Sequence, residues 1–146
     1  MTHDYPASYA FDDESDAWHI TFRDFPQQQT ACYSHDDIEL EAQESLLIAI
    51  ANEMAERRPL PPASPPRLDE IAIHLPVLVA LKLELHNIML AQTTSKADLA
   101  RKLGYNAAQI DRLLDISYAS KVEALEQALY LLGHEVRLAV TAISGK

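Results

Sequence analysis

The sequence predicts an α+β fold, with three strands and one helix (β-β-β-α) in an N-terminal module and a mainly helical second module. Apolar and polar residues alternate through much of the first 34 residues, which is the period of a half-buried strand. Beyond residue 76, apolar residues recur every three or four positions, as on one face of a helix. A proline-rich stretch separates the two regions. We therefore divide the chain into residues 1–58, a linker at 59–69 and a second module at 70–146.

The first two strands are predicted at residues 5–11 and 18–23, where aromatic and β-branched residues occupy alternate positions. The acidic residues 12–16 between them have the composition of a turn, so these strands should form a hairpin. A third strand is expected at residues 30–34.

A helix follows at residues 38–57. Its apolar residues between Leu46 and Met54 fall on one side of a helix. Asp36 and Asp37 stand where an N-cap and first-turn acids belong, and Arg57 and Arg58 stand at the C-terminal end. Both placements complement the helix dipole.

The predicted linker is rich in proline. Residues 58–66 contain five of the eight prolines of the chain, which excludes a helix interior or a central strand and favours a stiff, extended conformation.

The second module begins with a short strand at residues 71–75 and a helix at 76–91. Three further helices open at capping residues: at Ser95, ending at Gly104; at Asn106, continuing through Leu114; and at Ser120, ending at Gly133. The alternation at residues 136–141 predicts a final strand, which can pair with a second copy across a symmetry axis.

Charge is divided unevenly between the two regions. Residues 1–66 carry thirteen acidic residues against three arginines, whereas residues 67–146 carry nine acidic and nine basic residues. The first region should repel nucleic acid and attract a basic protein, and the second can approach phosphates if its basic residues share a face. The simpler alternative is that the negative surface only maintains solubility.

Several classes of function are disfavoured by composition. The apolar runs are far shorter than the roughly 18 residues of a membrane span, and the N-terminus lacks the pattern of a secretory signal, so we expect a cytoplasmic protein. The single cysteine, Cys32, excludes an internal disulfide and a multi-cysteine zinc site, and a buried thiol on a strand is its expected role. We expect no cofactor and no metal.

The helices on either side of Gly104 and Tyr105 have the spacing of a helix-turn-helix, whose second helix presents its N-terminal side chains to the DNA major groove. The candidate DNA-binding residues are Ser95, Lys96, Asn106, Ala107, Ala108, Gln109 and Arg112. Arginine and glutamine read base edges, alanines permit close approach, and Lys96 and Asn106 can reach phosphates.

Two observations limit this interpretation. Asp111 and Asp115 oppose DNA binding, and a helical hairpin used only for packing or dimerisation is the alternative. Because the second module has no net charge, specific binding requires two copies on half-sites about 34 Å apart.

Two stretches resemble known families. The sequence LARKLGY at 99–105, followed by QIDRLL at 109–114 and ALEQAL at 124–129, closely resembles repressor-type helix-turn-helix domains. The opening Tyr5-Pro6, the acidic hairpin, the stretch at 20–26 and the exit at 60–64 are together similar to the HicB antitoxin family. This chain has Arg23-Asp24-Phe25-Pro26-Gln27-Gln28 where that family usually reads Phe-Pro-Asp-Leu-Pro-Gly-Cys.

This resemblance implies a partial RNase H-like domain without that enzyme's catalytic set, joined to a DNA-binding domain. It implies a non-enzymatic antitoxin that binds and occludes HicA, a small basic RNA-cleaving toxin, and represses their shared operon. Because specific DNA binding requires two copies, we expect a homodimer or a homotetramer. We assign toxin contact to the hairpin acids Asp12, Asp13, Glu14 and Asp16, with a merely solvated turn as the alternative.

Two other functions stay open. One is a repressor whose N-terminal domain senses a small molecule and which has no toxin partner. The other is an active RNase H-like nuclease in which Asp12, Asp13, Asp16 and Asp24 hold Mg²⁺, which requires carboxylates converging from separate strands.

Overall fold

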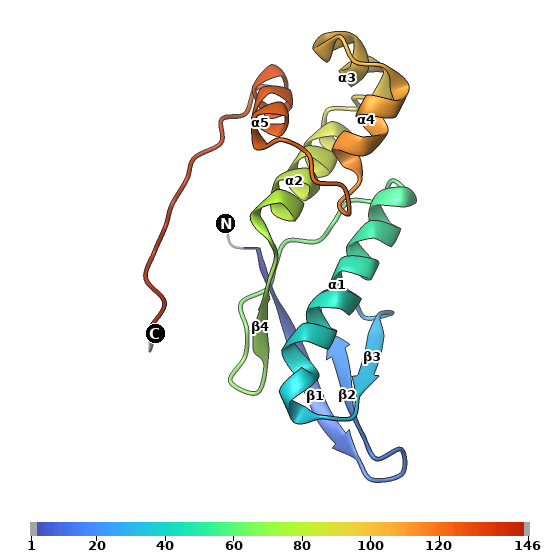
Figure 1. Ribbon diagram of the computed structural model, residues 1–146, viewed down its shortest axis with the longest axis vertical. Helices are drawn as coiled ribbons and strands as arrows, with labels where there is room; N and C mark the ends of the chain where they lie inside the picture. The colour runs from blue at the N-terminus through green and yellow to red at the C-terminus, as the bar shows by residue number, and fades with distance from the viewer. Residues whose placement is uncertain (1–2, 145–146) are drawn as a thin grey trace.

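The computed structural model describes residues 3–144 (Figure 1). Its elements, in chain order, are β1 (Asp4–Asp12), β2 (Ala17–Phe22), β3 (Gln29–Cys32), a 3-10 turn (His35–Asp37), α1 (Ile38–Ala55), β4 (Ile71–His74), α2 (Val77–Ala91), α3 (Lys96–Leu103), α4 (Ala107–Leu114) and α5 (Val122–Leu131). The α+β class with a helical C-terminal part is confirmed. No helix within residues 3–144 is both long enough and apolar enough to span a membrane.

The four strands form one antiparallel sheet in the order β3-β2-β1-β4. In the central hairpin, Ala7 lies opposite Phe22, and on the other side of β1 Tyr5 lies opposite Ile73. The alternation read from the sequence therefore places Tyr5 and Phe22 on the same buried face of the sheet.

Helix α1 covers this face of the sheet (Figure 1). Its buried residues Ala42, Leu46 and Ile50 pack against Ile20 and Phe22. The helix is preceded by a 3-10 turn whose cap is Ser34, which accepts a hydrogen bond from the Asp36 backbone N–H. Asp37 stands at the N-cap position of α1, as the sequence predicts, but its carboxylate makes no capping hydrogen bond.

The proline-rich segment packs against the rest of the protein. Leu60 is buried in the first core, and its backbone N–H and C=O both bind the side chain of Asn87 on α2, at 2.8 and 3.1 Å. The backbone N–H and hydroxyl of Ser64 donate to the Asp24 carboxylate at 2.8 and 2.6 Å. The segment is extended, as its composition predicts, but these contacts hold it in place at both ends.

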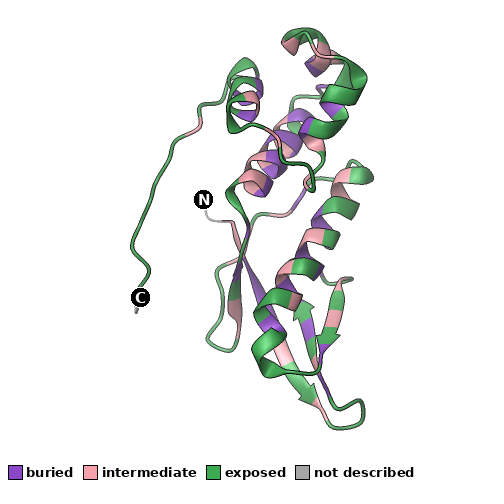
Figure 2. Ribbon diagram, viewed as in Figure 1, coloured by how far each residue is buried: buried purple, intermediate pink, exposed green. Residues whose placement is uncertain are grey.

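Helix α2 contributes to two hydrophobic cores. Val79 and Leu83 pack into the core between the sheet and α1, whereas Leu85 and Met89 pack into a second core with α3, α4 and α5. Figure 2 shows the resulting run of buried positions along α2. The structure thus places β4 and the start of α2 with the first core, beyond the boundary at residue 58 suggested by the sequence.

Two local predictions are wrong. Residues 136–141 form no strand within the described chain: Val136 packs against the second core, and the residues after it are exposed and run apart from the other elements (Figure 1). Ser120 does not cap α5. Lys121 is the N-cap, and the Ser120 hydroxyl instead donates to the Arg112 carbonyl, because the chain between α4 and α5 folds back on the end of α4.

Candidate functional site

The helices α3 and α4 both begin with reciprocal capping interactions. The Ser95 hydroxyl accepts from the Asp98 backbone N–H at 3.0 Å, and the Asp98 carboxylate accepts from the Ser95 N–H at 3.1 Å. Asn106 and Gln109 repeat the arrangement at the start of α4, both at 2.8 Å. These caps fix both helix starts by local chemistry, as the sequence predicts.

The turn between the two helices is closed by Gly104. Its φ of 70° lies in the left-handed region that glycine adopts without strain, and the Tyr105 N–H donates to the Ala100 carbonyl at 2.9 Å. Asn106 follows as the next cap. The turn sets α4 against α3 while leaving one face of α4 toward solvent.

That face carries most of the predicted DNA-binding residues. Ala107, Ala108, Gln109 and Arg112 are exposed, while Ile110 and Leu113 on the opposite face are buried in the second core. The Gln109 side-chain oxygen accepts the capping hydrogen bond from the Asn106 N–H, so the side-chain NH₂ group is the part left to contact a base. The structure brings these four residues together on one surface.

Lys96 lies beside this face in an ion pair. Its ammonium is 3.0 Å from the Asp111 carboxylate, which links α3 to α4 across the turn. Both side chains are more than half exposed. The pair partly neutralises the acid that the sequence identified as unfavourable for DNA, and it leaves Lys96 at the edge of the surface.

A buried lysine holds the far end of α4. Lys82 on α2 is fully buried, and its ammonium donates to the carbonyls of Arg112, Asp115 and Tyr118 at 3.1, 2.6 and 2.7 Å. It also donates to the Ser120 hydroxyl at 2.9 Å. Burial lowers the pKa of Lys82, and the Asp115 carboxylate opposes that shift.

Sequence reasoning missed this residue, although a signal was present. Lys82 stands in the buried stripe of α2, one helical turn from both Leu78 and Leu85, where a long charged side chain needs internal partners. Its position next to the C-terminal carbonyls of α4 is also the place where a helix dipole favours a cation. Lys82 therefore holds the C-terminal end of α4 in place. The Arg112 guanidinium lies over the Tyr118 ring at 5.7 Å, a cation–π contact at the same end of the helix.

The hairpin acids occupy the turn between β1 and β2. Asp12 accepts hydrogen bonds from the Ser15 hydroxyl and the Glu14 N–H, at 2.9 and 3.1 Å, and these bonds lower its pKa. Asp16 has a φ of 55°, so it forms the left-handed position of the turn. Asp13 and Glu14 are exposed. Two of the four acids thus have a structural role in the turn itself.

A partly exposed aromatic cluster adjoins this turn. Phe11, Tyr9 and His35 all pack edge-on against Trp18, at centroid distances of 5.3, 5.9 and 4.9 Å. Phe11 is 44% exposed, which is high for a phenylalanine. The end of the hairpin therefore combines negative charge with apolar surface, a combination suited to a protein partner.

Two of the acids that the nuclease alternative assigns to Mg²⁺ are engaged in other contacts. The Asp24 carboxylate accepts hydrogen bonds from Ser64, and Asp12 accepts hydrogen bonds within its own turn. Within residues 3–144, no three His, Cys, Asp or Glu side chains are grouped to hold a metal ion. Cys32 is buried at the end of β3, as predicted, and burial raises the pKa of its thiol.

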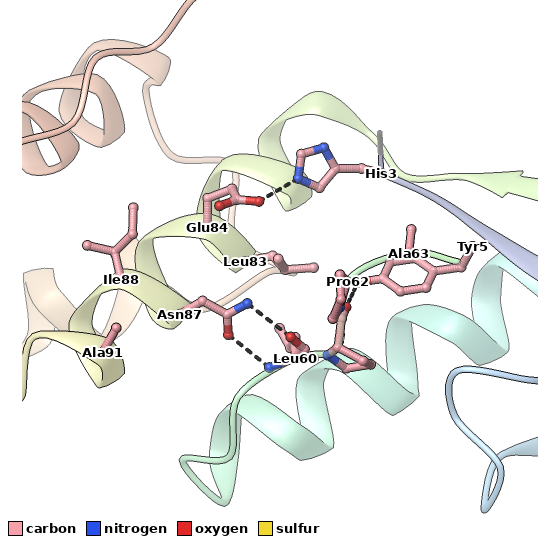
Figure 3. A pocket seen from close by; sticks show the side chains of 11 residues that line it. His3, Tyr5, Leu60, Pro62, Ala63, Leu83, Glu84, Asn87, Ile88 and Ala91 are labelled. Carbon is pink, nitrogen blue, oxygen red and sulfur yellow. Dashed lines mark hydrogen bonds and ion pairs between the residues drawn. The ribbon is translucent and has the colours of Figure 1, made fainter. Parts of the chain in front are cut away.

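A cavity of about 310 Å³ lies where the sheet, the proline segment and α2 meet (Figure 3). Its polar groups bind one another: His3 to Glu84 at 2.8 Å, Asn87 to Leu60, and the Tyr5 hydroxyl to the Pro61 carbonyl at 2.6 Å. Burial raises the pKa of Tyr5 to about 12, so this donor keeps its proton. The cavity wall therefore has few unpaired polar groups with which to orient a small molecule.

Comparisons with known proteins identify the family. Residues 4–84, from β1 to the middle of α2, match the family described as HicB-like antitoxin of bacterial toxin-antitoxin system. Antitoxin HicB 2 of Photorhabdus laumondii is 31% identical over 92% of this chain and 94% of its own length. Antitoxin HicB of Escherichia coli K12 is 29% identical over 82% and 86% of the two chains, and that of Pseudomonas fluorescens is 44% identical over half of each.

The matched region contains the whole four-stranded sheet, α1 and the packed proline segment, and the similarity to the Photorhabdus relative continues through α3, α4 and α5. The chain therefore belongs to the HicB-like family of toxin-antitoxin antitoxins.

Proposed function

We propose that this antitoxin neutralises a small basic HicA-type RNA-cleaving toxin through its N-terminal region and represses its own operon through α3 and α4. It acts in the cytoplasm as a homodimer or homotetramer and catalyses no reaction. The observation that carries the DNA-binding part is the exposed face of α4, on which Ala107, Ala108, Gln109 and Arg112 lie together.

Local charge supports DNA binding more than the charge of the whole second module suggests. Residues 95–114 carry four basic residues, Lys96, Arg101, Lys102 and Arg112, against two acidic ones. The N-terminus of α4 is the positive end of the helix dipole, which favours the approach of a phosphate. The two alanines at this end permit the helix to approach base edges closely.

The division of charge supports the toxin-binding part. An RNA-cleaving protein must bind a polyanion and so presents a basic surface, which the acidic region of residues 1–66 complements. The exposed acids Asp13 and Glu14 lie in the same hairpin as the partly exposed Phe11, so both charge and apolar surface are available there to such a partner. Occlusion of the toxin's RNA-binding surface would then suffice for inhibition.

Replacement of Arg112 tests the DNA-binding proposal. Arg112→Ala should weaken binding to the DNA upstream of the gene by about 1 to 3 kcal/mol and relax the preference at one base pair per half-site. Arg101→Ala, an exposed arginine on α3, is the control and should leave base preference unchanged. Fluorescence anisotropy with a panel of single-base operator variants measures both quantities. Unchanged affinity and preference in Arg112→Ala would remove this residue from base reading.

Recovery of the tagged chain from its native host tests the toxin-binding proposal. A small basic protein should co-purify in stoichiometric amount and be identified by mass spectrometry. If the host expresses the neighbouring genes and no such protein is recovered, the toxin assignment fails while the DNA-binding assignment stands.

A further inference from the structure

The chain between α4 and α5, residues 115–121, is anchored to the end of α4 by its backbone. The Lys82 ammonium binds the Arg112 carbonyl of α4 together with the Asp115 and Tyr118 carbonyls of this segment. The Tyr118 N–H also donates to the Asp115 carbonyl at 3.1 Å. The position of Tyr118 relative to α4 is therefore fixed by main-chain contacts that do not depend on its side chain.

The Tyr118 side chain lies against the arginine of the exposed face of α4. Its ring is 5.7 Å from the Arg112 guanidinium, within the range of a cation–π contact, and the residue is 46% exposed. The same ring lies 5.7 Å from the buried Lys82 ammonium. One aromatic ring thus joins a lysine fixed by four hydrogen bonds to the exposed arginine that is proposed to read a base.

Arg112 has no ion-pair partner among the described residues. None of the ion pairs within residues 3–144 includes it, although Asp115 follows it by three positions, the spacing of a helical ion pair. The Asp115 carboxylate instead accepts hydrogen bonds from the Ser117 N–H and hydroxyl, at 2.9 and 2.7 Å, and these bonds lower its pKa. The acid that could compete with DNA for Arg112 is therefore engaged within its own turn.

An arginine held in this way is prepared for base reading. A long side chain loses conformational freedom when it binds, and that loss reduces affinity. Contact with an aromatic ring restricts the guanidinium without using its N–H donors, so the donors stay available to guanine O6 and N7.

We infer that Tyr118 is a positioning residue for Arg112, whose ring holds the guanidinium in the conformation that reads a base pair. Tyr118 thereby sets part of the sequence preference of the protein without contacting a base itself. This inference rests on the proposed operator binding and names a residue that determines its specificity.

The sequence preference of three variants tests this role. Preference is the ratio of the affinities for the best operator and for an operator changed at the base pair that Arg112 reads, so it does not depend on the fraction of protein that is folded. Tyr118→Leu removes the ring and should lower this ratio by about two- to fivefold, the range of an exposed cation–π contact. Tyr118→Phe keeps the ring and should retain the wild-type ratio. Tyr33→Leu, the same substitution at an exposed tyrosine beyond β3, is the control and should also retain it.

A double-mutant cycle separates positioning from a direct contact with DNA. If Tyr118 acts through Arg112, then Tyr118→Leu should cause no further change of affinity or preference in an Arg112→Ala protein. If Tyr118 binds DNA itself, the two losses should add. An unchanged ratio in Tyr118→Leu, an equal loss in Tyr118→Phe, or additive losses would each overturn the inference.

A measurement without DNA tests the contact itself in the full chain. The face of an aromatic ring shifts the NMR signals of nearby protons to lower frequency, and the Arg112 side-chain signals are assigned by their loss in Arg112→Ala. They should be shifted in the wild type and in Tyr118→Phe, but not in Tyr118→Leu. Absence of this shift in a protein that binds its operator would overturn this inference alone. A normal shift in a protein that binds no operator would contradict the DNA-binding proposal and, with it, the role of Tyr118 in base reading.

Discussion

Replacing Lys82 by methionine removes the ammonium that joins α2 to the end of α4 while keeping a side chain of similar length. In the wild-type protein this ammonium makes four hydrogen bonds, three of them to backbone carbonyls. Each carbonyl also accepts a backbone bond: Arg112 from Asp115, Asp115 from Tyr118, and Tyr118 from Ser120. The substitution therefore weakens these groups without leaving any of them fully unpaired.

The expected loss in the free energy of unfolding follows from the number of hydrogen bonds removed. A buried hydrogen bond contributes about 1 kcal/mol net, and about 1.5 to 3 kcal/mol when one partner is charged. Removing the lysine also removes the cost of burying its charge, which is the cause of its lowered pKa. With four bonds lost and that cost relieved, Lys82→Met should lower the free energy of unfolding by roughly 3 kcal/mol.

Urea unfolding followed by circular dichroism measures this quantity, with Lys102→Met as the matched control. Lys102 is exposed on α3, and its replacement should change stability by less than about 0.5 kcal/mol. Amide hydrogen exchange gives a local readout, because the N–H groups of Asp115, Tyr118 and Ser120 should lose more protection than those of the β1–β2 hairpin. A loss below about 1 kcal/mol, or exchange that rises equally everywhere, would refute the assignment of Lys82 as a positioning residue for α4.

Two further predictions concern the first core. The pKa of Glu70 is lowered from its usual 4.5 to about 2, chiefly by the Arg23 guanidinium, which binds it at 2.7 and 3.1 Å. Because the folded state binds this proton less tightly, the ion pair stabilises the protein fully above pH 4.5 and less as the pH falls toward 2. Glu70→Gln should therefore reduce the loss of stability between pH 4.5 and 2. Thermal unfolding at a series of pH values measures this loss, with Glu123→Gln as the control. A pH dependence of the unfolding temperature parallel to that of the wild type would contradict the role of the ion pair. The division made from the sequence ends the first module at residue 58 and treats residues 59–69 as a linker, but the first core also includes Ile73, Leu75, Val79 and Leu83, each contributing about 1.5 to 3 kcal/mol. We expect a 1–66 fragment to be unfolded by circular dichroism and a 1–91 fragment to be folded, and a cooperative unfolding transition in the shorter one would restore the boundary at residue 58.

The local structure was largely predictable from the sequence because its causes are local. Alternation located β1 and β2, and helical periodicity located α1 and α2, each within a few residues of the observed ends. The reciprocal caps at Ser95 and Asn106 use residues three positions apart, so they can be recognised without a structure. Gly104 marks the turn for the same reason, since its backbone conformation is strained for other residues.

The contacts that position the candidate site were less accessible because their partners are distant in the chain. Lys82 binds carbonyls 30 to 36 residues away, and backbone carbonyls have no sequence signature. The proline segment was correctly described as extended, but its attachment depends on Asp24 and Asn87, which are 40 and 27 residues from their partners. Composition identifies a segment that does not form a helix. Only tertiary contacts decide whether that segment is a flexible linker or packs against the rest of the protein.

Helix α2 explains why the two regions of this antitoxin do not separate cleanly. One stretch of the helix completes the core under the sheet with Val79 and Leu83, and the next turns complete the core under α4 with Leu85 and Met89. From the same helix, the Lys82 ammonium donates to the Arg112 carbonyl of α4, and His86 lies 2.8 Å from the Arg58 carbonyl, just beyond the end of α1. A displacement of α2 by a partner bound to the N-terminal region would move the support of α4 directly, without passing through a flexible tether. Because α2 packs into both cores, a substitution near the proposed toxin-binding region must also be tested for its effect on DNA binding before its effect is attributed to the proposed toxin interface.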